Sequence, residues 1–431
     1  MSTVAHPSAE ARSVATRAVA GVLTEAGLAR LALSVAVLHV VDDNFLQPEA
    51  GTSAGDHLWG GLVQVALFVL FAWAYSRLRA GLRATLAIFV GIFIATMSIE
   101  AVNYLRESSI SGDDYTGLLT IPAGLLLVGV GLVTLWRTRK NGRPIRRYVR
   151  RALLAFGLVL GAVFVIYPVS QSYVITHTGR AFVPPENLGA PYEDVSFTTG
   201  DGLKLVGWYV PSRNGAAVIS FPGRKGPQKP ARLLARRGYG VLLFDRRGEG
   251  ESEGDPNLLG WQGTRDIEAA VAYLRTRPDV NGDRIGGLGL SVGGEMMLQE
   301  AAETDGLKAV VSEGAGVRSV REAVHVEGGE KVIFSWLFGL NTIGTAIFTS
   351  NLPPRSLTDL SAEITEPALF IHATPGGGGE TLTEKYYEAA TGPKEYWAAP
   401  GGHTGALDAA PEQYERRVVG FFDRHLLGRS S

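Results

Sequence analysis

The 431-residue sequence predicts a helical transmembrane bundle followed by an α/β domain with a mostly parallel β-sheet. Two observations lead to this prediction. Residues 1–175 contain several long apolar runs typical of a membrane domain, whereas residues 191–431 alternate strand-like apolar runs with helical segments, as in a soluble domain. A chain of this length also exceeds what one hydrophobic core ordinarily supports, so at least two domains are expected.

Composition excludes several classes of protein. The formal net charge of −1 argues against a nucleic-acid-binding protein with a basic face. The sequence has no cysteine, which excludes disulfides and thiolate metal sites. The N-terminus lacks a compact signal peptide with a small-residue cleavage site, so the apolar runs that follow are expected to be retained in the membrane.

Four apolar runs are nearly free of charge and each is about 20 residues long, enough to cross a hydrocarbon core of roughly 30 Å. They are Leu58–Tyr75, Leu82–Val102, Leu118–Trp136 and Ala152–Ile175. A fifth run, residues 28–46, is a weaker candidate because Asp42 and Asp43 fall near its end, where charge is costly away from the interface. We therefore expect a tail at 1–27, four or five spans within 28–175 and a linker at 176–190.

The loops between these runs differ in charge, which predicts their orientation. Two loops are basic and contain Arg77, Arg79, Arg83, Arg137, Arg139, Lys140, Arg143, Arg146, Arg147, Arg150 and Arg151. The other two loops are mainly acidic, with Glu49, Asp56, Glu107, Asp113 and Asp114. The positive-inside rule places basic loops in the cytoplasm. A multi-pass cell-membrane protein with an extracytoplasmic α/β domain is expected.

Polar residues at the end of the first run and in the loop after it resemble metal-binding or proton-relay groups. They are His39, Asp42, Asp43, Asn44, Asp56 and His57. The interpretation we favour is that they lie solvated in the headgroup zone and mark the ends of the spans.

The α/β domain begins with a hairpin and continues with apolar strands separated by helices. Gly200-Asp201-Gly202 is a turn signal between the strand-like runs 192–199 and 203–210. The buried strands that follow are predicted at Ala216–Phe221, Gly240–Asp245, Arg284–Leu290, Leu307–Ser312, Pro367–His372 and Glu395–Ala398. Helices are predicted at Ala231–Arg237, Thr264–Arg275, directly after Ser291, and at Pro411–Leu427. Continuous apolar strands alternating with helices predict a parallel sheet that is covered on both faces.

The pattern Gly-x-Ser-x-Gly occurs three times, around Ser53, Ser252 and Ser291. Only Ser291 has a predicted strand before it and a predicted helix behind it, the layout of a nucleophile elbow. Its flanking glycines fit a strained turn in which neighbouring side chains would collide. The turns around Ser53 and Ser252 are predicted to be structural.

Four segments of the domain carry a resemblance to a known family: SFPGRKG, ARLLARRGYGVLLFDRRGEGESEGDP, GLGLSVGGE and APGGHTGAL. On these segments, residues 190–428 resemble the α/β-hydrolase fold, closest to membrane-tethered members of the dienelactone hydrolase and acyl-thioesterase branch. The resemblance implies a mostly parallel sheet with a small helical cap, which we expect at about 315–358. Its segment 334–338 offers an apolar surface to an acyl chain, although ordinary packing of the cap explains that segment almost as well.

A serine hydroxyl needs a base within hydrogen-bond reach to act as a nucleophile. His403 lies in a Gly-rich loop after the last strand, where this fold presents its catalytic imidazole, whereas His325, His372 and His425 are expected to be structural.

The third member of the triad departs from the family pattern, because no Asp stands after the strand 367–372. Glu380 is the only carboxylate in that loop, and four glycines before it allow it to fold back. Glu313 is the rival, since some members take the acid from that strand. A site without an acid is the third possibility.

The oxyanion hole is expected to use the backbone N–H of Val292 and a second N–H from Arg224 or Gly223. Arg224 and Lys225 could also attract an anionic substrate, although solvated loop cations are commoner. The segment 245–250 resembles a turn of the family in which charged side chains brace neighbouring loops.

We therefore expect a membrane-anchored serine hydrolase that cleaves a carboxylic ester or thioester through an acyl-enzyme intermediate, with no metal and no organic cofactor. Its expected partners are a small-molecule acyl substrate and the lipid bilayer; no nucleic acid is expected, and the sequence names no protein partner. The alternatives are a serine peptidase on the same fold and a non-catalytic hydrolase-like binding domain on a membrane anchor.

Overall fold

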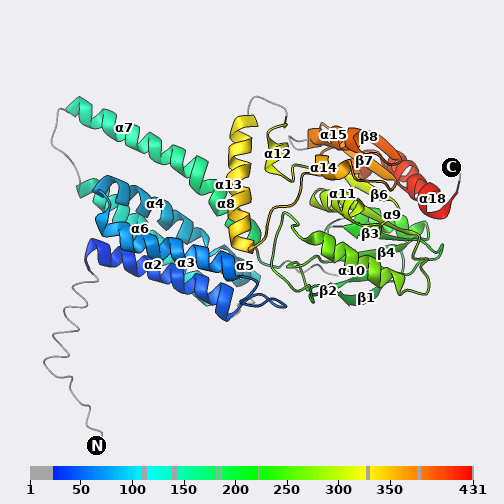
Figure 1. The fold of residues 1–431 in the computed structure, drawn as a ribbon, viewed down its shortest axis with the longest axis horizontal. Helices are drawn as coiled ribbons and strands as arrows, with labels where there is room; N and C mark the ends of the chain where they lie inside the picture. Colours follow the sequence, from blue (N-terminus) through cyan, green and yellow to red (C-terminus); the bar gives the residue numbers. More distant parts are fainter. Residues whose placement is uncertain are drawn as a thin grey trace, which may run out of the picture. The chain divides into compact units, whose positions relative to one another are not determined.

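The computed structural model describes residues 23–107, 114–137, 144–180, 183, 187–221, 224, 226, 228–326, 331–375 and 380–429. The chain forms two compact units. The first comprises the residues up to Pro48 together with Ser53–Gly179, and the second comprises Glu49–Thr52 together with Arg180–Ser431. In Figure 1 the labelled elements of the first unit are helices, and those of the second unit are a sheet and the helices that cover it.

In the described part of the first unit the regular elements are helices. These are α2 (Glu25–Val41), η1 (Asp42–Leu46), α3 (Leu58–Ala74), η2 (Tyr75–Arg77), α4 (Ala80–Thr96), α5 (Ile99–Glu107), α6 (Asp114–Arg137), α7 (Pro144–Gly161), η3 (Ala162–Ile166) and α8 (Tyr167–Thr176). Helices α4 and α6 approach closely at glycines. A Cβ on Gly91 would lie 2.7 Å from the carbonyl oxygen of Gly124, and one on Gly124 would lie 2.5 Å from that of Gly91. Small residues at such a crossing are typical of helix packing in membranes.

Four helical stretches of this unit are long and apolar enough to cross a membrane, judged by length and composition. They are Leu58–Arg77, Ala80–Arg106, Tyr115–Arg137 and Tyr148–Thr176, and they coincide with the four stronger runs of the sequence. The weaker run, now α2 and η1, does not meet the same criterion. A further helix that does meet it, Lys331–Thr349, belongs to the second unit.

The second unit is built on an eight-stranded sheet with the order β1-β2-β4-β3-β5-β6-β7-β8. The strands are β1 (Glu193–Thr198), β2 (Lys204–Val210), β3 (Ala217–Phe221), β4 (Gly240–Phe244), β5 (Ile285–Leu290), β6 (Val310–Glu313), β7 (Ala368–Thr374) and β8 (Lys394–Pro400). The hairpin β1–β2 and the β2–β4 pair are antiparallel, and the pairs from β4 to β8 are parallel. This mostly parallel sheet, with its strand-to-helix turn after β5, is the α/β-hydrolase fold.

Helices cover both faces of the sheet, as Figure 1 shows. They are α9 (Gln228–Arg236), α10 (Gly263–Arg275), α11 (Val292–Glu303), α15 (Thr383–Ala389), α16 (Ala406–Ala409), α17 (Pro411–Tyr414) and α18 (Gly420–Leu427). The short 3-10 helix η4 (Glu380–Leu382) follows β7, and the π-helical turn η5 (Glu415–Val419) joins α17 to α18, where the sequence predicts one helix.

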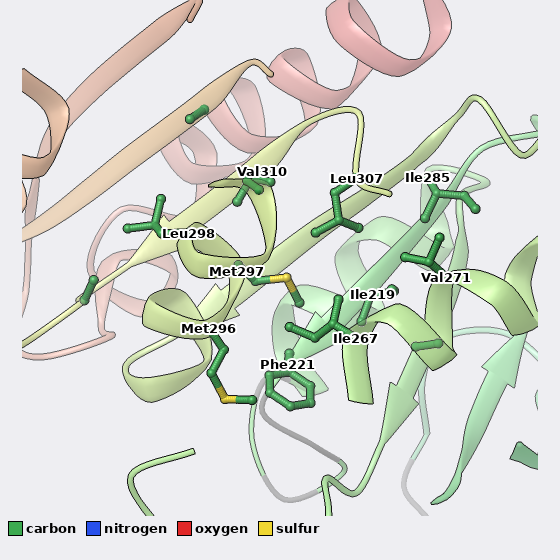
Figure 2. Close-up of a cluster of buried hydrophobic side chains, with 14 of the residues drawn as sticks. Ile219, Phe221, Ile267, Val271, Ile285, Met296, Met297, Leu298, Leu307 and Val310 are labelled. Atoms are coloured by element: carbon green, nitrogen blue, oxygen red, sulfur yellow. The ribbon is translucent and has the colours of Figure 1, made fainter. Parts of the chain in front are cut away.

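Two hydrophobic cores lie on the two faces of the sheet. On one face, Met296 and Met297 of α11 and Ile267 of α10 pack with Ile219 and Phe221 of β3 (Figure 2). On the other face, α9 and α18 supply buried side chains. These cores hold β5 and α11 rigidly around the turn at residue 291.

The chain between β6 and β7 forms an insertion with three helices, α12 (Val320–Ala323), α13 (Lys331–Thr349) and α14 (Leu357–Ser361). This is the region in which the sequence predicts a cap.

Candidate active site

Ser291 lies in a strained turn between β5 and α11. Its φ of 53° and ψ of −125° fall in a region that non-glycine residues rarely occupy. A Cβ on Gly289 would lie only 2.2 Å from the carbonyl oxygen of Gly293, so the helix can follow the strand this closely only because Gly289 has no side chain. The Ser291 N–H donates to the carbonyl oxygen of Glu313 at 2.8 Å, which ties the turn to β6.

The structure brings Ser291, His403 and Glu380 together. Ser291 Oγ lies 2.9 Å from Nε2 of His403, and Nδ1 of the same ring forms a short hydrogen bond with Oε1 of Glu380. The Glu380 side chain is 3% exposed and the imidazole is 50% exposed, so the carboxylate is shielded from solvent while the imidazole is accessible to it. This is the order of contacts that general-base activation of a serine requires.

Gly314 and His372 position the acid, and sequence reasoning missed both roles. A Cβ on Gly314 would lie 2.8 Å from Glu380 Oε1 and 3.2 Å from Cε1 of His403, so this position must stay bare for the two side chains to meet. The Nδ1 atom of His372 forms a 2.9 Å hydrogen bond with the carbonyl oxygen of Glu380. For His372, the signal in the sequence is a polar residue near the end of the apolar strand β7.

Glu313 has a different contact. Its Oε1 accepts a hydrogen bond of 3.1 Å from the N–H of Ala406, at the start of α16 and three residues beyond His403. Burial raises the pKa of the Glu313 carboxyl. Glu313 therefore anchors the loop that carries the imidazole, while Glu380 is the carboxylate that contacts the ring.

Of the expected oxyanion donors, Val292 stays a prediction, whereas Arg224 is contradicted by its contacts. Val292 is the first residue of α11, where the N–H groups have no partner within the helix. The prediction for Arg224 is wrong, because its N–H donates to Oδ1 of Asp245 at 3.1 Å. Its guanidinium is also buried and paired with Asp245 at 2.5 Å and Glu251 at 2.7 Å, so it is no anion-attracting loop cation. Gly223, the other candidate donor, and Lys225 lie outside the described residues.

The other two Gly-x-Ser-x-Gly turns hold their serines in structural contacts. Ser252 is fully buried; its hydroxyl donates to the carbonyl oxygen of Asp245 at 2.5 Å and accepts from the N–H of Val206 at 2.9 Å. The hydroxyl of Ser53 donates to Asp56 at 2.7 Å in an exposed turn.

A buried arginine, also missed from the sequence, ties the insertion to the helix behind the elbow. Arg318 donates to Gln299 at 2.6 Å and to Glu295 at 3.3 Å, both on α11. It also donates to the carbonyl oxygen of Gly260 at 3.2 Å. The base of the insertion is thus fixed to the elbow helix.

Four of the six polar residues, His39, Asp42, Asn44 and His57, are buried within the first unit, contrary to the solvated arrangement favoured from the sequence, whereas Asp43 is partly buried and Asp56 is exposed. His39, Asp42 and His57 are each less than 8% exposed. The two ring nitrogens of His39 lie 3.2 Å from the hydroxyls of Thr116 and Tyr173, on α6 and α8. The sequence cannot reveal this burial because it depends on how α2 packs between other helices. Among the described residues, no group of three or more His, Cys, Asp or Glu could hold a metal ion.

Comparisons with known proteins agree with this architecture. Residues 191–355 match the family of X-Pro dipeptidyl-peptidases (S15 family). The protein Rv2307c of Mycobacterium tuberculosis is 31% identical over 282 residues, which cover 61% of this chain and 89% of Rv2307c. The α/β hydrolase domain-containing protein WAV2 of Arabidopsis thaliana is 26% identical over 51% of this chain and 70% of its own length. The chain belongs to the α/β-hydrolase superfamily.

Two further matches are more limited. The chain spans only 62% of the length of the first curated relative it matches, YfhR of Escherichia coli, which is 29% identical over 39% of this chain. Among solved structures, the esterase Pf2001 of Pyrococcus furiosus superposes with a TM-score of 0.48 at 23% identity, over 57% of this chain and 97% of the esterase.

Proposed function

We propose that the protein is a membrane-anchored serine hydrolase that cleaves an ester or thioester through an acyl-enzyme intermediate. The observation that carries the proposal is the 2.9 Å contact between Ser291 Oγ and His403 Nε2, with the buried Glu380 carboxylate on the opposite ring nitrogen.

Catalysis begins when Ser291 Oγ attacks the acyl carbonyl carbon and His403 Nε2 takes its proton. Glu380 holds the ring in the tautomer that accepts at Nε2 and stabilises the imidazolium that forms. The N–H of Val292 donates to the oxygen on which negative charge develops. His403 then protonates the leaving alcohol or thiol, and a water molecule, deprotonated by the same imidazole, releases the acid and frees Ser291.

A serine peptidase is the second candidate, favoured by the match of residues 191–355 to the S15 family. That match contains Ser291 but ends before Glu380 and His403. Two carboxylates lie on helices close to the elbow, Glu295 on α11 and Glu322 on α12. Glu295 pairs with the Arg318 side chain, and Glu322 accepts a hydrogen bond of 3.0 Å from the Arg318 N–H. Neither carboxylate is therefore placed to bind a free peptide amine. We therefore favour the ester or thioester hydrolase.

The membrane anchor is part of the proposal. Segment Glu49–Thr52 belongs to the second unit, where the Arg180 guanidinium lies 2.6 Å from Glu49 and the Gly254 N–H donates to the Ala50 carbonyl oxygen at 2.8 Å. Four candidate spans lie between this segment and Arg180. An even number of crossings returns the chain to the side from which it started, which supports four spans. With the basic loops cytoplasmic, the catalytic unit is extracytoplasmic.

Labelling with a fluorophosphonate probe tests the catalytic proposal. The wild-type chain and Ser252→Ala are expected to label, whereas Ser291→Ala is expected to lose labelling and to reduce hydrolysis of a p-nitrophenyl ester by about 10⁴-fold or more. Activity on an X-Pro p-nitroanilide that exceeds activity on esters would favour the peptidase. Absence of label in the folded wild-type chain would favour a binding domain.

Sidedness is testable with single cysteines, because the chain has none of its own. Glu412→Cys on the second unit is expected to react with an impermeant maleimide on intact cells. Arg79→Cys, in a basic loop, is expected to react only after permeabilisation. The reverse pattern would place the catalytic unit in the cytoplasm.

A further inference from the structure

Helix α13 is an apolar helix with several large side chains exposed. It runs from Lys331 to Thr349, and Lys331 is its only charged residue. Val332 is 73% exposed, Trp336 54% and Ile343 59%. Exposed apolar area of this extent is unfavourable in water and marks an interaction surface.

The exposed apolar side chains of the second unit are concentrated on the insertion. Within the described part of this unit, one large apolar side chain outside the insertion is exposed, Leu258 at 39%. The other exposed ones all lie between residues 320 and 352: Val320, Val324, Val332, Ile333, Phe334, Trp336, Ile343 and Leu352. We call these eight side chains the apolar surface of the insertion.

Helix α13 is long and apolar enough to cross a membrane, but the topology of the sheet excludes a crossing. The strands on either side of the insertion pair in parallel, from Val310 with Ala368 to Glu313 with Ile371. A single crossing between them would place β6 and β7 on opposite sides of the bilayer. In the described part of the insertion, α13 alone is long enough to cross, so no second span can return the chain.

Two features point to the bilayer as the occupant of this surface. The second unit begins at Arg180, four residues after α8 ends at Thr176, and four residues reach at most about 14 Å. Glu49–Thr52, between the first two helical segments of the other unit, also belongs to the second unit. Two short chain connections, one at each of these points, thus join the catalytic unit to the candidate spans. An apolar helix with aromatic residues and a terminal lysine is suited to the boundary between headgroups and acyl chains.

The insertion connects this surface to the site around Ser291. It starts at Gly314, which packs against Glu380 and His403. Arg318 then fixes its base to α11, and Asn351, just after α13, is hydrogen bonded to Gln262. The described parts of the insertion thus contact both the catalytic residues and the loop that precedes α10.

We propose that α13 lies in the bilayer leaflet next to the catalytic unit, parallel to the membrane, and admits acyl esters or thioesters with long apolar chains from the lipid phase. This inference rests on the proposed hydrolase activity, whose substrate class it narrows.

The test uses the full-length protein in nanodiscs that hold one chain each, which removes a second copy as an occupant. Val332→Cys and Ile343→Cys carry an environment-sensitive fluorophore, and Gln413→Cys on α17 is the matched control. At positions 332 and 343 the emission is expected to shift to the blue and to be quenched by lipids that carry a spin label on their acyl chains. Neither effect is expected at position 413. Water-like emission at positions 332 and 343 overturns the proposal. Blue-shifted emission that the spin-labelled lipids do not quench also overturns it, because it means that protein and not lipid covers α13.

A functional measurement separates this inference from the catalytic proposal. The double variant Val332→Asp/Ile343→Asp is expected to raise the KM for a vesicle-borne long-chain thioester at least about tenfold, because charge is costly in the membrane. Its kcat/KM for p-nitrophenyl acetate and its Ser291 labelling by the fluorophosphonate are expected to stay within about twofold of wild type. An unchanged KM of the double variant together with intact labelling would contradict only the membrane placement of α13. Absence of labelling in the folded wild-type chain would contradict the hydrolase proposal itself.

Discussion

The turns around Ser291 and Ser252 share the pattern Gly-x-Ser-x-Gly but differ in what surrounds the hydroxyl. Ser252 is fully buried and its oxygen both donates and accepts a backbone hydrogen bond, so it has no freedom to react. Ser291 is held with a φ of 53° between a strand and a helix, and its oxygen faces an imidazole at 2.9 Å. The pattern therefore specifies a tight turn, and the strand-to-helix setting determines whether the serine can act as a nucleophile.

The glycines of the two turns are required for different reasons. At Gly289 a Cβ would meet the backbone of the helix that follows, at 2.2 Å from the carbonyl oxygen of Gly293. At Gly250, whose φ is 53°, a Cβ would lie 1.9 Å from a carboxylate oxygen of Asp245. One turn is tight so that a helix can begin directly behind the serine, and the other is tight so that it can wrap a buried ion pair.

The largest effect is expected from removing the charge behind the imidazole of the Ser291 turn. Glu380→Gln leaves a side chain of similar shape that no longer enforces the productive tautomer of His403, so kcat for an ester is expected to fall by up to about 10⁴-fold. Glu313→Gln is the matched control, because the amide oxygen can still accept from Ala406, and its kcat is expected to stay within about threefold. A larger loss in Glu313→Gln than in Glu380→Gln would identify Glu313 as the acid.

The next largest effect is expected on the pH dependence of stability, from buried carboxyl groups near the Ser252 and Ser291 turns. Asp245 at the Ser252 turn pairs with Arg224. Glu300, on the helix behind Ser291, is fully buried, and its Oε1 accepts a hydrogen bond of 2.7 Å from the Thr304 hydroxyl. Burial raises the pKa of Glu300 from 4.5 to about 8. The folded state therefore keeps a proton that the unfolded state releases, and the stability associated with this group is lost as pH rises from about 4.5 to about 8.

Glu300→Gln is expected to remove this loss. At about 1.4 kcal/mol per pKa unit, the wild-type chain should lose a few kcal/mol relative to the variant between pH 5 and pH 8.5. Thermal unfolding of both proteins in the same detergent at the two pH values measures the difference. Parallel curves for the two proteins would show that Glu300 is ionised in the folded state.

Much of this fold and site could be predicted because the signals are local. Continuous apolar runs predict the central strands, and Ser291 is set apart from Ser252 by a helix that starts at the next residue. The contacts that sequence reasoning missed join residues far apart in the chain. The N–H of Arg224 is occupied by Asp245, 21 positions away, and nothing in the loop itself reveals that acceptor.

The choice between Glu380 and Glu313 also required the structure. Glu313 is the last residue of β6 and Glu380 follows the neighbouring strand β7, so both lie at the same edge of the sheet. The decision depends on the bare backbone at Gly314, which lets Glu380 approach His403. The burial of His39 and the exposed surface of α13 likewise depend on tertiary packing, which the composition of a helix does not specify.

A smaller effect is expected at the Ser252 turn. Ser252→Ala removes both hydrogen bonds of the hydroxyl and leaves the N–H of Val206 and the carbonyl oxygen of Asp245 buried without this partner. The free energy of unfolding is expected to fall by about 2–3 kcal/mol. Activity per folded molecule, counted by fluorophosphonate labelling, should be unchanged. A large loss of kcat in fully folded Ser252→Ala would contradict a structural role.

The smallest effect is expected at the third turn of the same pattern. Ser53 lies in an exposed turn of the first unit, where its N–H and its hydroxyl both donate to Asp56, at 2.8 Å and 2.7 Å. Ser53→Ala loses only the hydroxyl contact, and water can replace it at both ends, so the change in stability is expected to be about 0.5 kcal/mol or less. Labelling and ester hydrolysis should match the wild-type chain. A marked loss of labelling or of ester hydrolysis in a folded Ser53→Ala protein would mean that the Gly-x-Ser-x-Gly pattern has a functional role without a strand, a helix or an imidazole beside it. The contrast between the Ser291 and Ser252 turns would then no longer explain which serine reacts.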